Sequence, residues 1–113
     1  MQVLSLKVND KTYTTSRVTA YLARKAMEID TAALKMAKAG EEIQKTASPD
    51  LAEVQALMEQ MTQINDSKSW FICQIYGEKF GIEELEKEFT NEEIDAEINR
   101  ITRAIYGVIE KNV

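Results

Sequence analysis

The chain has 113 residues, of which 44% are hydrophobic and 29% charged, and its 14 basic and 19 acidic side chains give a net charge of −5. This size and composition predict a single domain over residues 1–113. The negative charge argues against a nucleic-acid partner, because affinity for phosphate backbones comes from Lys and Arg. With no His and one Cys, Cys73, the sequence excludes disulfides, Cys/His zinc sites and His-based catalysis.

No apolar run approaches the roughly 18 residues of a membrane span, so no membrane partner is expected. The N-terminus alternates polar and apolar residues instead of forming a secretory apolar block, which predicts a cytoplasmic protein.

Residues 1–15 predict a β-hairpin. Every second residue of Leu4–Val8 is apolar, which is typical of a half-buried strand. Asn9 and Asp10 tolerate the positive φ of a two-residue turn, and residues 11–15 are rich in β-branched and aromatic side chains. Because an isolated hairpin is marginally stable, its apolar face should pack on the segments that follow.

Residues 16–39 predict one long helix, with Ser16 as N-cap and Gly40 just beyond its C-terminus. Four apolar residues share the face expected to meet the core: Val18, Leu22, Ile29 and Met36. A second apolar sector lies roughly opposite, where a simple two-layer domain would be polar; it contains Ala23, Met27 and Leu34.

Residues 48–76 predict a second helix, which Ser48 caps and Pro49 begins. Its expected buried face contains Leu51, Val54, Leu57, Met58, Met61 and Ile64. The periodicity is interrupted at residues 65–69, since a straight continuation would place Lys68 in the apolar sector and Trp70 in the polar one. We therefore expect a kink, or a fresh helix capped by Asp66 or Ser67.

Residues 83–89 predict a short acidic helix, and residues 90–111 a final helix. The final helix opens with a capping box, Thr90 to Glu93, and carries isoleucines at spacings of three and four residues. The expected fold class is therefore mainly α (α+β): an N-terminal β-hairpin followed by a bundle of four to five helices.

The acidic side chains concentrate between Glu78 and Glu97. We interpret this segment as a solvated acidic face or as a surface that steers a basic partner, because glutamates spread around a helix do not form a calcium loop. Cys73 lies in an apolar run with no His to activate it, which indicates packing. The sequence thus predicts no catalytic residue, no cofactor, no metal site and no enzyme.

Three large apolar side chains, Met27, Leu34 and Trp70, fall away from the main core in this phasing, and we predict them as partner-binding residues. The alternative, that the hairpin or a bend near Ser67 covers them, stays open.

Two stretches resemble the tail assembly chaperones of long-tailed phages and prophages of Gram-positive bacteria. Residues 6–13, LKVNDKTY, resemble that family's N-terminal strand, turn and strand. Residues 72–85, ICQIYGEKFGIEEL, resemble its apolar helix end, aromatic-Gly, Phe and acidic helix, and the Ile-rich last helix follows in the same order.

The resemblance implies a non-enzymatic assembly factor in the host bacterial cytoplasm that is absent from the mature virion. Its partners would be the tape measure protein, which it keeps soluble, and the major tail protein, which displaces it; a homo-oligomer is also implied. The alternative hypothesis is a small regulatory or anti-defence protein of a mobile element that binds one host protein.

Overall fold

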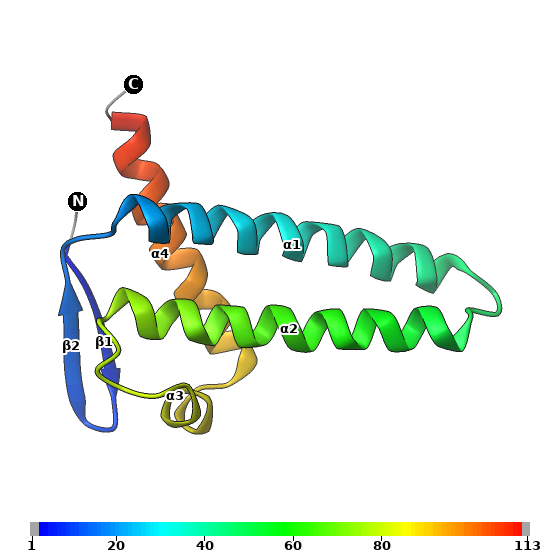
Figure 1. The fold of residues 1–113 in the computed structure, drawn as a ribbon, viewed down its shortest axis with the longest axis horizontal. Coiled ribbons are helices and arrows are strands. Elements are labelled where there is room, and N and C mark those ends of the chain that lie inside the picture. The colour runs from blue at the N-terminus through cyan, green and yellow to red at the C-terminus, as the bar shows by residue number, and fades with distance from the viewer. Residues whose placement is uncertain (1–2, 112–113) are drawn as a thin grey trace.

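The structure, a computed structural model, describes residues 3–111. Two strands precede four helices: β1 (Leu4–Val8), β2 (Lys11–Thr15), α1 (Ala20–Lys45), α2 (Leu51–Ile75), α3 (Ile82–Glu88) and α4 (Asn91–Lys111) (Figure 1). This confirms the predicted mainly helical fold with an N-terminal hairpin. Of the four to five helices expected, the described residues form four.

The hairpin is antiparallel, with Leu4 opposite Thr15 and Val8 opposite Lys11. Asn9 and Asp10 have φ of 50° and 65°, as the predicted two-residue turn requires. The turn is held against α3, because the Asn9 backbone N–H donates to Glu88 Oε2 at 2.5 Å. Leu4 and Val8 are buried, so the predicted apolar face of the hairpin packs on the helices.

The predicted bounds of the first helix, residues 16–39, are wrong at both ends. α1 begins at Ala20, where the Thr19 hydroxyl accepts from the Leu22 N–H at 3.2 Å, and Ser16 lies in the preceding link. It also continues through Gly40 to Lys45. Ile43 extends the apolar spacing beyond Gly40, and packing along α2 outweighs the roughly 1 kcal/mol that a helical glycine costs.

α2 begins at Leu51, with Asp50 instead of Ser48 as N-cap, and runs to Ile75 as one helix. The fresh helix expected near Ser67 is absent from the described chain, because other elements satisfy the polar side chains that interrupt the apolar pattern. Lys68 pairs with Asp95 of α4 at 2.7 Å. The buried Ser69 hydroxyl donates to Glu86 Oε2 of α3 at 2.9 Å.

The predicted short helix and the predicted capping box both occur. In the box, Thr90 Oγ1 accepts from the Glu93 N–H at 3.1 Å, and the Thr90 N–H donates to Glu93 Oε1 at 3.0 Å. Ile94, Ile98, Ile101 and Ile105 are buried. Ile109, the fifth member of the predicted stripe, lies outside the residues whose side chains are described.

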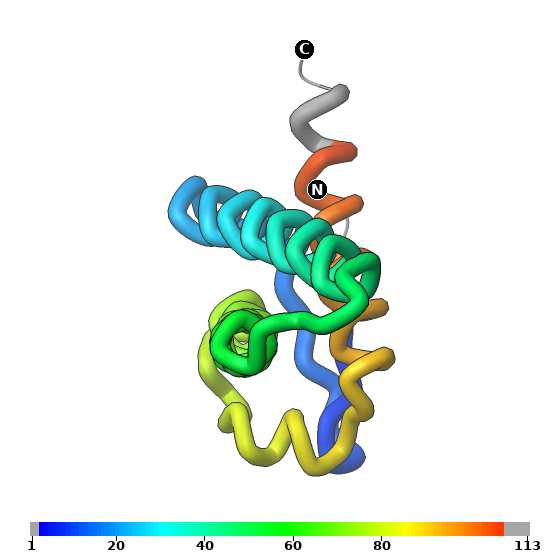
Figure 2. Tube along the Cα trace, turned by 90° about the vertical axis from the view of Figure 1, so that its right-hand side faces the viewer, coloured from blue at the N-terminus to red at the C-terminus, as the bar shows by residue number. Residues whose placement is uncertain are grey.

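The molecule consists of a head and an arm. Among the residues whose side chains are described, the buried ones lie within two stretches, 4–29 and 64–105, which form the head. Residues 30–63 contain no buried residue; this arm is the antiparallel pair of α1 and α2 where it runs beyond the other elements (Figure 1). Seen along the arm, α4 passes on one side of the pair (Figure 2). The molecule measures 48 × 38 × 19 Å.

Candidate functional site

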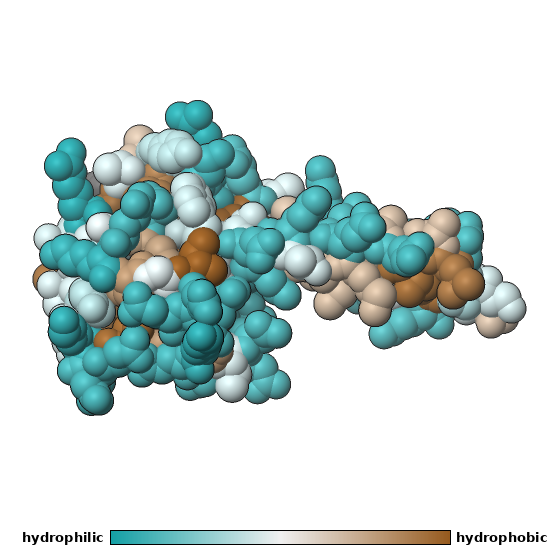
Figure 3. Space-filling model, turned by 60° about the horizontal axis from the view of Figure 1, so that its bottom comes forward, coloured by the Kyte–Doolittle hydropathy of each residue, from teal (hydrophilic) through white to brown (hydrophobic). Residues whose placement is uncertain are grey.

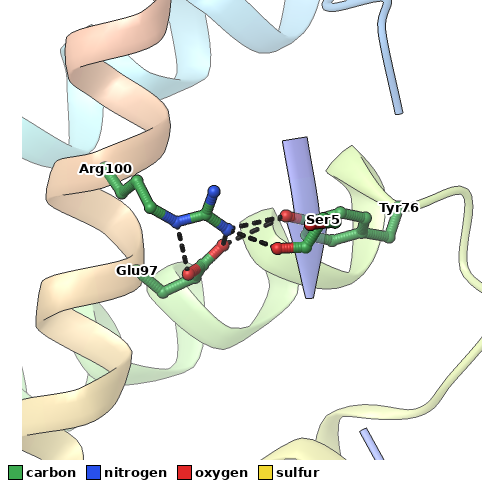
Figure 4. Close-up of polar contacts among 4 residues, drawn as sticks. All are labelled: Ser5, Tyr76, Glu97 and Arg100. Atoms are coloured by element: carbon green, nitrogen blue, oxygen red, sulfur yellow. Dashed lines mark hydrogen bonds and ion pairs between the residues drawn. The ribbon is translucent and has the colours of Figure 1, made fainter. Parts of the chain in front are cut away.

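A polar cluster in the head lies where the hairpin, the C-terminal end of α2 and α4 meet (Figure 4). Arg100 of α4 donates to the Ser5 backbone carbonyl of β1 at 2.7 Å and to the Tyr76 hydroxyl, directly after α2, at 3.2 Å. The Tyr76 hydroxyl donates to Glu97 Oε1 at 3.1 Å. Burial and the neighbouring Glu97 carboxylate raise the pKa of Tyr76, so the phenol stays protonated. The cluster joins the hairpin, the end of α2 and α4.

α4 also marks where the head ends along each helix of the arm. On α1, Asp30 Oδ2 accepts from the Tyr106 hydroxyl at 3.0 Å. On α2, Lys68 pairs with Asp95. Farther along the arm, in the described part of the chain, α1 and α2 contact only each other (Figure 1).

The arm therefore exposes apolar side chains that a third helix would ordinarily cover. Half-buried Met36, Ile43, Val54 and Leu57 lie along its length. Four large side chains are more exposed: Leu34 at 68%, Leu51 at 80%, Met58 at 62% and Met61 at 44%. In the space-filling view, apolar side chains gather towards the end of the arm (Figure 3). Uncovered apolar surface of this kind marks a protein contact when it is contiguous.

Two hollows open between α1 and α2. The tip hollow, of about 360 Å³, is lined by four apolar residues, Ala39, Ile43, Ala56 and Leu57, and by four polar ones, Glu42, Thr46, Glu53 and Gln60. The base hollow, of about 310 Å³, lies between the head portions of α1 and α2, next to the arm; its lining includes Tyr21, Lys25, Glu28, Ile64 and Trp70 from the head and Ala32 from the arm.

The two hollows lie on the same side of the arm. Ala32 and Ala39 are seven residues apart, which places them on one face of α1. Trp70 is two residues from Lys68, and hence about 160° around α2 from the residue that pairs with α4. The hollows therefore face away from α4.

The structure does not gather the three predicted partner-binding residues into one patch. Met27 and Leu34 are exposed on the outer face of α1, and neither the hairpin nor a bend in α2 covers them. Trp70 is partly buried, packs against the core and lines the base hollow, which neither Met27 nor Leu34 lines.

Sequence reasoning missed the exposure of Leu51, Met58 and Met61, which were expected on a buried face. Their helical spacing is the same as that of a covered helix. No local sequence signal distinguishes a covered helix from an uncovered one, because exposure depends on whether another element extends along that part of α2.

The remaining candidate groups have structural roles. Burial, with a smaller effect of Glu86, raises the pKa of the Cys73 thiol to about 11. Glutamates of the acidic segment serve as local partners: Glu83 pairs with Lys87, Glu86 accepts from Ser69, and Glu88 accepts from Asn9. In the described part of the chain, no three acidic or cysteine side chains are grouped so that they could hold a metal ion.

Within the same residues, no helix combines the length and apolar character that crossing a bilayer requires. Comparisons with protein-family models, curated proteins and solved structures found no match to this chain.

Proposed function

We propose that the protein is a non-enzymatic tail assembly chaperone of a long-tailed phage or prophage. It binds the tape measure protein in the host cytoplasm, keeps it soluble and releases it as major tail protein assembles. The resemblance of residues 6–13 and 72–85 to that family supports this proposal.

The observation that carries the proposal is the uncovered apolar surface of the arm. A chaperone for a long helical client needs apolar contacts that form and exchange without unfolding the chaperone itself. The arm meets this need, because residues 30–63 contribute no buried side chain to the core of the head.

Charged side chains between these apolar contacts serve the same purpose. Lys35, Lys38, Glu41 and Glu59 are exposed on the arm and keep the free chaperone hydrated. A surface of mixed charge and single apolar side chains suits weak, repeated binding better than permanent association.

Co-expression with the long helical open reading frame beside the gene tests the proposal. We expect the client to be soluble only with this protein and to co-purify with several copies of it. Leu51→Ser/Met58→Ser should lower the soluble client at least threefold, because both side chains lie uncovered on the arm. Met27→Asp and Leu34→Asp test the outer face of α1 in the same assay.

The matched control is Val3→Ser/Ile82→Ser, which removes two exposed apolar side chains that lie outside the arm and should leave the soluble client unchanged. A client that is equally soluble without the protein would rule out the proposed function. In that case, a one-to-one complex with a single host protein would favour the mobile-element regulator instead.

A further inference from the structure

We propose that the two hollows between α1 and α2 form one continuous groove for a single amphipathic client helix, whose basic end lies at the tip between Glu42 and Glu53. This inference rests on the proposed function and adds a second client-binding surface to the arm, because the exposed side chains of Leu34, Leu51 and Met58 line neither hollow.

The groove has the dimensions of a helix-binding site. Its lining runs along α2 from Glu53 to Trp70, which at 1.5 Å per residue spans about 26 Å, or roughly 18 residues of a bound helix. A third helix in this position would cover Ile43 and Leu57, which are only half-buried in the free protein. Helices commonly recognise partner helices in this way, by laying an apolar face into a groove.

The two ends of the groove differ in charge. At the base, Lys25 and Glu28 neutralise one another at 3.1 Å, and the Lys25 ammonium lies 5.4 Å from the centre of the Tyr21 ring. At the tip, Glu42 and Glu53 form no ion pair with any side chain in the described part of the chain, and the tip hollow has no basic residue in its lining.

This asymmetry identifies the complementary ligand. A Lys or Arg near the tip would pair with Glu42 and Glu53, whereas the base, with Tyr21 and Trp70, accepts a neutral apolar or aromatic side chain. The groove therefore selects a helix that is basic at one end and apolar along one face, and it fixes the direction in which that helix lies.

Trp70 provides a direct reporter, because it is the only tryptophan of the chain and lines the base hollow. The probe is an 18-residue Trp-free peptide with Leu at helical spacing and two Lys in its last turn; companion peptides carry Glu or Gln at those two positions. We expect the Lys peptide to shift Trp70 emission saturably, with a Kd about three- to tenfold lower than that of the Glu peptide, as two partly exposed ion pairs would give.

The double variant Glu42→Gln/Glu53→Gln should abolish this preference and leave the Kd of the Gln peptide unchanged. Glu41→Gln/Glu59→Gln is the matched control: it removes the same charge from the same two helices but outside the tip hollow, and it should keep the preference. A preference that survives in Glu42→Gln/Glu53→Gln, or peptides that leave Trp70 emission unchanged, would overturn the assignment.

The outcomes separate this inference from the proposed function. If the Lys preference depends on Glu42 and Glu53 but the tape measure protein is indifferent in co-expression, the groove stands and the client is another helical protein. If the client is solubilised but Glu42→Gln/Glu53→Gln changes nothing, the groove assignment falls and the function stands. If sedimentation shows self-association that requires both glutamates while no peptide binds, a second copy occupies the groove and the inference is overturned.

Discussion

Three polar side chains at the C-terminal end of α2 point into the head, and each meets an acid from α3 or α4. Lys68 meets Asp95, Ser69 meets Glu86, and Tyr76 meets Glu97. A buried polar group without a partner costs on the order of 1–3 kcal/mol, so the contacts of Lys68 and Ser69 help α2 to continue without a break, and that of Tyr76 holds the residue that follows it. Part of the acidic segment therefore has a structural role inside the protein.

Tyr76→Phe tests this arrangement through its dependence on pH. At pH 8 the variant should lose about 1 kcal/mol of unfolding free energy, because Glu97 and Arg100 lose a hydrogen-bond partner. The folded pKa of Tyr76 lies above the unfolded value of about 10. The stability from its protonated hydroxyl is therefore fully present below pH ~10 and is lost as the pH rises through the folded pKa.

Urea unfolding of wild type and Tyr76→Phe at pH 8 and pH 11 provides the measurement. The difference in unfolding free energy should be smaller at pH 11, since only the wild type loses the contribution of Tyr76. The raised pKa of Cys73 affects the unfolding free energy of both proteins equally, so it cancels in the difference between them. Tyr21→Phe, at an exposed ring, should change little at either pH. A difference that does not vary with pH would contradict this account of Tyr76.

At the scale of elements, α1 shows that a glycine ends a helix only when nothing beyond it continues the packing. Gly40 lies within α1, and a Cβ built there would meet the Leu57 Cδ2 atom at 3.9 Å, an ordinary van der Waals distance. The position therefore has both the space and the backbone conformation for a side chain.

Gly40→Ala should stabilise the protein by about 0.5–1 kcal/mol, because alanine loses less backbone entropy in a helix than glycine does. Gly77→Ala is the matched control, since Gly77 has a φ of 79° where it follows α2, and the same substitution there should destabilise by about 1 kcal/mol. Urea unfolding of both variants measures the two effects. A loss of stability in Gly40→Ala would mean that α1 is not a regular helix at this residue.

The sequence predicts those elements whose signals are local. The Asn9-Asp10 turn and the box from Thr90 to Glu93 both form as expected, because each depends on residues within a few positions of one another. The end of α1 and the continuity of α2 could not be predicted in this way. They depend on Leu57 beside Gly40 and on Asp95 beside Lys68, which are distant in sequence.

The same limit applies to the candidate site. Phasing placed Met27 and Leu34 away from the core, and both are exposed. Met58 could not be identified, because its spacing matches that of a buried face and the missing cover is a property of the tertiary arrangement. Trp70 was assigned away from the core, yet it packs at its edge and forms one wall of a hollow.

At the scale of the whole molecule, α1 and α2 each lie partly in the head and partly in the arm. Their head portions pack against other elements, whereas in the arm, beyond the contact of Asp30 with Tyr106, each helix is covered by its partner alone within residues 3–111. Local stability follows the density of buried contacts, so the two portions of one helix should open independently. In the proposed chaperone, local opening lets the arm adapt to successive client segments while the head stays folded.

Hydrogen exchange measures this difference within a single helix. Amides of α2 in the arm, residues 54–62, should exchange at least tenfold faster than those at residues 66–75, which lie in the head. The internal comparison controls for helix type and solvent conditions. Gly40→Ala should slow exchange in the arm and leave residues 66–75 unchanged, because it stabilises only the local helix pair. Uniform protection along α2 would instead show that another chain covers the arm in solution, and dilution would then restore the difference.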